Sequence, residues 1–440
     1  MMPEIIDKTR AEHSASWSKL EDFTLRPLAR PSTKGQKILM LFLALMFVIG
    51  IGAWIRQLTF GLTETGLGVP VFWGVYIINF VFFIGISHAG TLLSAILRIV
   101  KADWRAPFTR LAEMITITSI PFAATCVIVD MGRPERFLNV LLYPHFTSPI
   151  LWDVCCITTY IIMSSLYFYT ALIPDLALCR DRLDGHIPAW RMEFYQMSAL
   201  GWTGSETQKR LHHKIMTVLS IILLALVISV HTNVGFVFGM TIKPGWHTAI
   251  IGPYFVIGAA EQGLGVLGLI AVFVRWFFRL HSWLTEKHLD ALRQFTLALT
   301  CFWGYFTGAE ILTTFYGHAP AEMQVLWSKI AGPFWWSFWG MILGCFFIPF
   351  ILLAFRPFRL SRVLALSGLS INIGMWLERY TIVVPSGANP FVSFVGRYSP
   401  SWTEWAITAG WISGFLLLLL LFMRLFPILT IWEIEETANS

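Results

Sequence analysis

Ionisable side chains inside otherwise apolar stretches are the residues of this sequence best suited to chemistry. They comprise two histidines, six carboxylates and one arginine: His88, His231, Glu113, Asp130, Asp153, Glu261, Glu310, Glu378 and Arg379. A charged side chain near the middle of a bilayer costs at least roughly 2.5 kcal/mol, so each of these groups needs a partner or a function. Imidazole and carboxylate groups also accept and release protons in catalysis. The set therefore indicates proton-handling chemistry within an apolar protein.

Three interpretations compete for these residues. The first is haem ligation, which requires paired histidines on facing helices. Only two of the eleven histidines lie in apolar stretches, His88 in the middle of one and His231 in the outer half of another. Two histidines are too few to bind two haems. Because we also expect the two rings at different depths, even one haem is barely accommodated. The second interpretation is packing, in which buried polar groups satisfy one another and fix the contacts between helices.

The third interpretation is a quinone site. A quinol that loses two electrons must also lose two protons, so its hydroxyl groups need acceptors in an otherwise apolar pocket. His88 with Asp153 or His231 supplies such acceptors, and Glu113 lies where a proton relay toward the cytoplasm would begin. A second relay through the remaining carboxylates is a hypothesis that rests on Glu261, Glu310 and the Glu378–Arg379 pair.

Ten apolar runs must position these residues. They are 38–58, 70–97, 108–129, 150–173, 215–240, 249–275, 292–317, 331–355, 360–380 and 402–427. Each is long enough to cross roughly 30 Å of hydrocarbon as a helix. A mean hydropathy of +0.65 and a charged fraction of only 13% exclude an ordinary soluble domain. The sequence therefore predicts an all-α polytopic membrane protein of about ten transmembrane helices, with a short amphipathic helix in the loop around 187–200.

The basic residues are divided unevenly between the two sides of the predicted membrane. Only seven of the 32 Lys and Arg residues fall at one set of span ends: Arg56, Arg133, Arg136, Lys243, Lys329, Arg379 and Arg397. By the positive-inside rule both termini face the cytoplasm, and the loop at 130–137 lies outside. The net charge of +6 is then an orientation signal facing anionic lipid rather than a sign of nucleic-acid binding. The expected location is the inner membrane of a bacterial cell, with run 38–58 as a retained signal anchor.

A faint internal repeat suggests how the spans are grouped. Trp73 precedes His88 by fifteen residues, and Trp246 precedes Glu261 by the same spacing in a span of the same direction. This pattern predicts two parallel four-helix bundles with flanking helices. The expected division along the chain is a cytoplasmic tail at 1–37, helix 38–58, a first bundle with the quinol site at 70–240, a second bundle at 249–380, helix 402–427 and a cytoplasmic tail at 428–440.

Several motifs resemble the NrfD-like family of quinone-interacting membrane subunits. They run from the Gly85–Ile96 segment, which contains His88 and Thr91, through Gly132-Arg133-Pro134 and the Ser148–Val154 segment to Leu172–Asp175. Further matching segments are Pro244–Thr248, Gly252–Val256, Gly332–Trp336 and Asn372–Arg379. The last of these looks most like the ActC type of subunit in bacterial alternative complex III. One departure is Asp130-Met131, where relatives of that type often carry histidine before the Gly-Arg-Pro motif.

The resemblance implies a binding site for menaquinol or ubiquinol near the outer face. The quinone-binding residues would be Asn79, His88, Thr91, Arg133, Asp153 and His231, with His88 and Asp153 as the catalytic pair. The candidate proton path comes instead from the ionisable residues of the spans described above: Glu113, Asp130, Glu261, Glu310, Glu378 and Arg379. Electrons would pass to an iron–sulfur subunit and then to multihaem cytochrome c subunits on the outer face, next to a second NrfD-like membrane subunit. The chain itself would bind no haem, iron–sulfur cluster or other metal, and its six cysteines show no spacing suited to one.

Three other functions remain open at the level of sequence. The first is the reverse reaction, in which the chain anchors a molybdopterin or cytochrome complex that reduces quinone. The second is a proton-coupled transporter, although transporters often show inverted repeats whereas the repeat here is parallel. The third is a purely structural anchor, which should keep turnover when His88 is lost. Arg133 and Arg136 have two expected roles as well: pairing with acidic groups of a partner, or stabilising negative charge on the quinone.

Overall fold

A computed structural model describes residues 24–25, 27–278, 280–390 and 396–434, apart from the side chains of residues 91–93 and 103. Within these residues ten helices are long and apolar enough to cross a membrane. This confirms the predicted fold class of an all-α polytopic membrane protein. Most of the predicted N-terminal tail and the last six residues of the C-terminal tail lie outside the described part of the chain.

The spanning helices follow the predicted runs in order. They are α2 (Lys34–Phe60), α3 (Val75–Ile99), α4 (Ala106–Asp130), α6 (Pro149–Arg182), α8 (Glu206–Gly239), α9 (Ile251–Phe277), α10 (Glu286–Gly317), the α12–α13 span, α14 (Leu360–Ala388) and α15 (Trp402–Leu425). The α12–α13 span consists of α12 (Trp335–Ile342), a π-helical turn (Leu343–Phe347) and α13 (Ile348–Phe355). Three shorter helices lie between the spans: α5 (Asn139–Leu142), α7 (Ala189–Ser198) and α11 (Pro320–Ile330). The amphipathic helix expected near 187–200 is α7.

Three helices extend well beyond the apolar runs that predicted them. Helix α6 continues past residue 173 to Arg182, α8 begins at Glu206 rather than 215, and α14 continues past residue 380 to Ala388. Hydropathy marks only the part of a helix that matches hydrocarbon, whereas the backbone hydrogen bonds of a helix continue into polar sequence until a cap ends them. Ser205 provides such a cap, because its side chain accepts a hydrogen bond from the backbone N–H of Gln208 at 3.3 Å.

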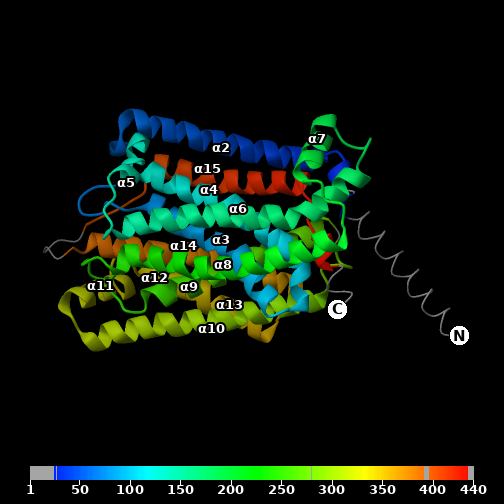
Figure 1. Ribbon diagram of the computed structural model, residues 1–440. Coiled ribbons are helices and arrows are strands. Elements are labelled where there is room, and N and C mark those ends of the chain that lie inside the picture. The colour runs from blue at the N-terminus through cyan, green and yellow to red at the C-terminus, as the bar shows by residue number, and fades with distance from the viewer. Residues whose placement is uncertain (1–23, 26, 279, 391–395, 435–440) are drawn as a thin grey trace.

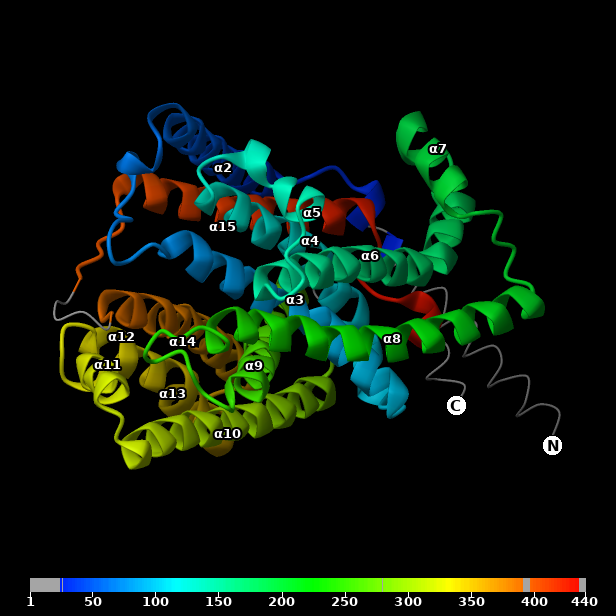
Figure 2. The same ribbon diagram turned by 60° about the vertical axis from the view of Figure 1, so that its left-hand side comes forward.

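The helices lie roughly side by side, as Figure 1 and Figure 2 show, and their loops form two ends. We call one the Arg133 end; it carries α5, α11 and the loop at 240–250. We call the other the Glu433 end; it carries α7 and the segment 426–434 that follows α15. Helices α2 and α15 pack against each other along one edge. A Cβ added at Gly50 of α2 would lie 2.7 Å from the Cα of Gly410 in α15, so the absence of side chains allows this close approach.

Helix α3 occupies the centre of the array, where it contacts α4, α8 and α9. It crosses α9 so closely that a Cβ on Gly263 would lie 2.6 Å from the backbone nitrogen of Ala89. At the Arg133 end the two tryptophans of the sequence repeat, Trp73 and Trp246, stack with ring centroids 5.5 Å apart and planes inclined by 24°. We refer to α3, α4, α6 and α8 as the first helix group and to α9, α10, α12–α13 and α14 as the second. Their independence as two bundles stays a prediction.

The segment after α15 folds back over the Glu433 end of the first helix group. The Glu433 carboxylate is fully buried, and its oxygens lie 2.7 Å from Arg98 and 2.8 Å from Arg105. Thr430 donates a hydrogen bond to the backbone oxygen of Ala106, and the Trp432 indole donates one to that of Ala171. These contacts tie the end of the chain to α3, α4 and α6.

Candidate functional site

A large cavity of the first helix group lies at the Arg133 end. Its volume is about 520 Å³ and its walls are mostly apolar. The lining residues come from the segment before α3 and its first two turns, the end of α4, the 131–140 segment, α6 and α8: Trp73, Ile77, Phe80, Ala124, Val127, Ile128, Asp130, Met131, Phe137, Val140, Ile150, Asp153, Val154, Ile157, Thr158, Ile161, Val237 and Phe238. A large apolar cavity with few polar groups suits an amphipathic organic ligand.

Two carboxylates provide the ionisable groups of this cavity, and both were predicted from the sequence. Asp130 is the last residue of α4, and Asp153 lies in the first turns of α6. Each has one buried oxygen, Oδ1, without a hydrogen-bond partner in the described protein. A buried polar atom without a partner is costly, so it indicates a ligand, a water molecule or a proton. Both residues thus border the cavity, and each keeps one carboxylate oxygen buried within the protein wall beside it.

The cavity reaches the outer surface of the helix array between α4 and α6. Thr158, which lines it, is exposed, and Ile128 and Ile161 are half-buried. Their neighbours on α6 include the strongly exposed Ile162 and Leu166, which form part of an apolar face suited to lipid. An apolar ligand could therefore move between this cavity and the hydrocarbon of the membrane without crossing water.

The two membrane histidines lie against each other rather than at different depths. The rings of His88 in α3 and His231 in α8 are both buried, with centroids 4.0 Å apart and an edge-to-face angle of 71°. The expectation of different depths was wrong because it counted residues along each span separately. Helices α3 and α8 run in opposite directions and are offset along their axes, so sequence position alone does not give relative height. The rings are in direct contact, with no gap for a porphyrin between them.

The two histidines differ in their hydrogen bonds. The nitrogens of His88 lie 2.8 Å from the backbone oxygen of Ile84 and 3.2 Å from that of Val227. Both nitrogens of His231 are buried without a partner in the described protein. The pair lies near the cavity, because the Tyr160 ring, whose centroid is 5.7 Å from that of His88, belongs to the same turn of α6 as the cavity-lining isoleucines at positions 157 and 161.

Glu113 belongs to a buried ionic cluster toward the Glu433 end. Its carboxylate lies 3.4 Å from Arg110, and Arg110 also pairs with Asp175 at 2.6 Å. The Ser94 hydroxyl lies 3.5 Å from Glu113 and 2.9 Å from the Tyr167 hydroxyl. A small cavity of about 10 Å³, enough for one water molecule, separates Glu113 from Ser164, whose hydroxyl is buried without a partner in the described protein. Polar groups thus line the first helix group between the histidines and the Glu433 end.

Three predicted groups of the second helix group are buried close to α3. Glu261 in α9 accepts a hydrogen bond from Thr300 at 2.8 Å. Glu378 in α14 accepts one from the Trp303 indole at 3.0 Å and forms an ion pair with Arg379. The Arg379 guanidinium also lies over a phenylalanine of α9, at position 255, 5.3 Å from the ring centroid. These contacts explain how the charges are held in an apolar environment.

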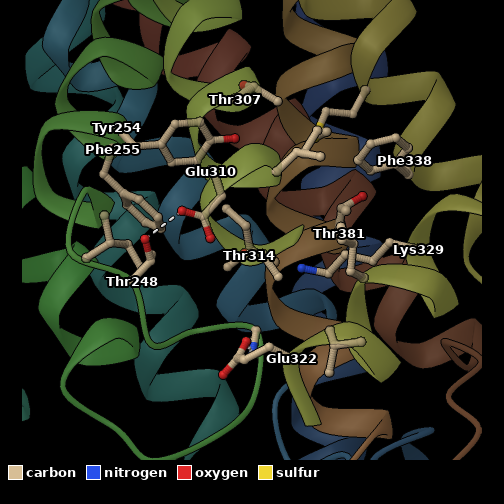
Figure 3. Close-up of a pocket in the computed structure, with 17 residues that line it drawn as sticks. Thr248, Tyr254, Phe255, Thr307, Glu310, Thr314, Glu322, Lys329, Phe338 and Thr381 are labelled. Atoms are coloured by element: carbon tan, nitrogen blue, oxygen red, sulfur yellow. Dashed lines mark hydrogen bonds between the residues drawn. The ribbon is translucent and has the colours of Figure 1, made fainter. Parts of the chain in front are cut away.

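Glu310 lines a second cavity, of about 80 Å³, at the Arg133 end of the second helix group. Its Oε2 accepts a hydrogen bond from the Thr248 hydroxyl at 2.5 Å. Figure 3 shows the carboxylate facing the cavity, with Lys329 on the opposite wall and Glu322 at one end. The sequence interpretation counted Lys329 only as a loop charge, because it lies outside the apolar runs.

Among the other predicted quinone-binding residues, Asn79 and Arg133 do not line the first cavity. The side chain of Asn79 binds other helices: its NH₂ group donates a hydrogen bond to the Thr408 hydroxyl at 2.8 Å, and its oxygen accepts one from the Trp376 indole at 3.0 Å. Arg133 is exposed at the surface beside the cavity-lining loop. The side chain of Thr91 lies outside the described residues. Asn79 therefore connects α3 to α14 and α15, which is a packing role that a polar residue in a membrane helix often has.

Sequence reasoning missed several buried charges. Arg98, Arg105 and Glu433 form ion pairs at the Glu433 end, and Asp175 pairs with Arg110. Arg110 carried a usable signal, because it precedes Glu113 by three residues and so shares a helix face with it. Glu433 carried none, because a carboxylate in a short tail after the last span is normally exposed to water.

Comparisons with known proteins agree with the resemblance seen in the motifs. A protein of Halobacterium salinarum described as a putative membrane subunit of dimethyl sulfoxide reductase is 30% identical over 231 residues, which is about half of each chain. A selenate reductase subunit of Mesobacillus selenatarsenatis is 23% identical over 89% of this chain and 94% of its own. The Hdr-like menaquinol oxidoreductase integral membrane subunit of Archaeoglobus fulgidus is 22% identical over 91% of this chain and 96% of its own.

The family described as polysulphide reductase, NrfD, matches residues 63–389. This range begins before α3 and ends just after α14, so it includes the first cavity, the histidine pair and the second helix group. The narrower resemblance to alternative complex III is not shown by these matches. With three quarters of its length matched and ten apolar helices, the chain is a multi-span integral membrane protein that belongs to the polysulphide reductase NrfD family.

Proposed function

We propose that this chain is the quinone-binding membrane subunit of a redox enzyme complex, with the first cavity as its quinone site. The observation that carries the proposal is an apolar cavity of about 520 Å³ that reaches an apolar surface of the helix array and is lined by two carboxylate residues, Asp130 and Asp153. Such a site matches a molecule with an isoprenoid tail and two oxygens that exchange protons. The relatives support the proposal by name, since one is a menaquinol oxidoreductase subunit and two are reductase subunits.

The carboxylates would act on the protons that accompany electron transfer. When the quinone is reduced or the quinol oxidised, each oxygen gains or loses a proton, and a positioned carboxylate can accept or donate it. Asp153 and Asp130 line the cavity and are the candidates for contact with the ligand. His231 and His88 lie near the cavity, so in this account they receive protons from it. Contact between His88 and the quinone, as expected from the family motifs, would require one of its bonds to a backbone oxygen to be exchanged.

The direction of electron flow depends on the partners of the chain. In the account favoured by the sequence, menaquinol or ubiquinol is oxidised and electrons pass to an iron–sulfur subunit and cytochrome c subunits docked at the Arg133 end. The exposed Arg133 and Arg136 of that end suit the acidic surface of a partner. The reverse direction is the second candidate, favoured by the two relatives that are named as subunits of reductases. In both accounts the quinone site is the same.

The experiment compares Asp153→Asn with the wild-type chain in the purified complex, timing the reduction of the partner cofactors by a quinol analogue. Asn keeps the shape of the side chain but removes proton exchange, so we expect turnover to fall by roughly 10²-fold or more. Asp181→Asn is the matched control, because Asp181 lies near the end of the same helix, is exposed and pairs with Arg180 at 2.7 Å. Equal turnover in Asp153→Asn and wild type, with all subunits present, would remove Asp153 from the chemistry.

A further inference from the structure

The second cavity combines apolar walls with a cluster of charged and hydroxyl side chains that the quinone proposal does not use. Its walls come from α9, α10, α11, α12 and α14, together with the loop at 240–250. Four threonines and one tyrosine add hydroxyl groups to the lining: Thr248, Thr307, Thr314, Thr381 and Tyr254. As Figure 3 shows, Glu310 and Lys329 approach from opposite walls, whereas Tyr254 and Thr307 lie at the end farthest from Glu322.

The size of this cavity suits a few water molecules better than a quinone ring. A water molecule needs about 10–15 Å³ of such space and two to four polar partners. The volume of about 80 Å³ therefore accommodates several waters, and the hydroxyls and charged groups supply their partners. At the deep end the hydroxyls of Thr307 and Tyr254 interact with each other, so they form a small polar group next to the cavity.

Lys329 is a cation placed among acidic groups. It lies on α11 outside the spanning helices, and burial lowers its pKa, an effect that Glu310 and Glu322 oppose. Glu322 is held by the backbone N–H of Gly245 at 2.6 Å, and Glu310 is held by Thr248. An ammonium group that faces a carboxylate across water favours the ionised form of that carboxylate, so it can assist the release of a proton from Glu310.

A buried ion pair lies directly beyond the deep end of the cavity. The ring of Tyr254, which lines the cavity, is 6.5 Å from that of Trp303, and the Trp303 indole donates to Glu378. The Arg379 guanidinium lies over the ring of another lining residue, Phe255, at 5.3 Å from the centroid. Glu378 and Arg379 are thus separated from the cavity by one layer of side chains, and the Glu310 carboxylate is on the cavity side of that layer.

We propose that the second cavity is an aqueous proton port of the second helix group, in which water reaches Thr307 and Tyr254 from the Arg133 end and Glu310 exchanges protons with it beside Lys329. The ligand class is water and hydrated protons. In each exchange the O–H bond of the Glu310 carboxyl breaks, the proton passes to a water oxygen and the carboxylate keeps the electron pair. This port lies apart from the first cavity, so it adds a second function to the chain rather than another part of the quinone site.

The first arm of the test measures access of water to the cavity. Thr307→Cys, in the whole complex, is treated with a charged, water-soluble thiol reagent, and labelled peptides are identified by mass. Thr and Cys are similar in size, so the fold is retained. The native Cys301 is the internal control, because it lies on the same helix but is exposed on the outer face of the array. We expect rapid labelling at position 307 and slow labelling at Cys301; no labelling at position 307 in the folded complex would overturn the proposal.

The second arm measures protons released per electron by the complex in sealed vesicles. Glu310→Gln should lower this ratio by half or more, while uncoupled electron transfer stays within about twofold of wild type. Lys243→Gln is the matched control, since Lys243 lies over the Trp246 ring at the same end but does not line the cavity. An unchanged ratio in Glu310→Gln would overturn the proposal. Because the labelling arm needs no quinol, failure of the port is distinguishable from failure of the quinone site.

Discussion

At the scale of single residues, the contacts of His231 make it possible to test whether this side chain has a chemical role or only a packing role. Its two ring nitrogens are buried without partners in the described protein, whereas those of His88 lie on two backbone oxygens. Removing a buried polar group that makes no hydrogen bond is close to neutral for stability, or stabilising, when an apolar group of similar shape replaces it. A histidine kept for packing alone would therefore be replaceable by phenylalanine without loss of activity.

We expect His231→Phe to keep or raise the thermal midpoint of the complex and to lower quinol-dependent turnover by roughly 10²-fold, the scale of one proton-transfer group. The measurement pairs a thermal unfolding curve with a turnover assay. His212→Phe is the control on the same helix: it loses a bond to the backbone oxygen of Thr170 at 2.9 Å, so its stability should fall while the turnover of the folded protein stays. If the His231→Phe protein kept full turnover, His231 would have only a packing role.

At the scale of elements, the crossing of α3 and α9 determines where the two helix groups meet. A Cβ on Gly263 would lie 2.6 Å from a backbone nitrogen of Ala89, and a backbone atom cannot move aside as a flexible side chain can. We predict that Gly263→Ala destabilises the protein by about 1–3 kcal/mol through overpacking. Gly308→Ala is the control, because nothing lies within 4 Å of its added Cβ.

The measurement compares the thermal midpoints of the Gly263→Ala and Gly308→Ala proteins in the same detergent or lipid. Gly308→Ala should be neutral or stabilising, since alanine favours the helix by up to about 1 kcal/mol. A Gly263→Ala protein as stable as Gly308→Ala would show that α3 and α9 separate easily. The close contact would then not determine the distance between the histidine pair and Glu261.

The segment after α15 gives a second prediction at this scale. Burial raises the pKa of Glu433, but Arg105 and Arg98 outweigh that effect, so the pKa lies below its ordinary value. A carboxylate whose pKa is lower in the folded than in the unfolded protein stabilises the fold. The stabilisation is complete above the unfolded pKa of about 4.3 and is lost as pH falls through the folded pKa. Glu433→Gln should therefore lower stability by about 3–5 kcal/mol at neutral pH, since it removes the charge that the two arginines share.

The same variant should lose part of the acid sensitivity of the wild type. Its difference in thermal midpoint from wild type is expected to shrink as pH falls from about 4.3, where the unfolded carboxyl binds a proton, through the lower pKa of the folded carboxyl, below which the wild-type group is also neutral. Glu206→Gln serves as the control, because the Glu206–Lys209 pair is exposed and such pairs contribute about 0–1 kcal/mol. A Glu433→Gln protein that behaves like Glu206→Gln would mean that this segment is not fixed to the first helix group.

At the scale of the whole molecule, the distribution of basic residues predicts its orientation. The Arg133 end should face the outside and the Glu433 end the cytoplasm. Single cysteines at two exposed positions test this in intact cells: Asn139→Cys in α5 and Asp184→Cys in the loop before α7. A thiol reagent that does not cross membranes should label position 139 and leave position 184 unlabelled until the cells are opened. The opposite pattern would reverse the sides assigned to both cavities.

The sequence was sufficient for the fold class and for most of the elements. Apolar length identified all ten spans, because a chain in hydrocarbon must satisfy its backbone in helices. The equal spacing of Trp73 and Trp246 also carried spatial information, since the two rings stack. Asp130 and Asp153 were identified as candidates, but nothing in the sequence showed that they share one cavity.

The positions of the helices relative to one another could not be predicted from the sequence. The contact of His88 with His231 depends on how α3 and α8 are offset, and the partners of Asn79 come from α14 and α15, about three hundred residues away. Single-span patterns contain no information on such offsets. Glu433 and Lys329 were missed for a related reason: each lies outside the apolar runs and is removed from water only because other segments cover it.

The central claim, that a quinone binds in the first cavity, is tested most directly by photolabelling. The whole complex is irradiated with a photoreactive quinone analogue, with and without excess natural quinol, and the labelled peptides are identified by mass. The account predicts labelling on α4 and α6, within residues 124–131 and 150–161, that excess quinol suppresses. Quinol-sensitive labelling confined to the second cavity, or labelling that quinol does not suppress, would contradict it.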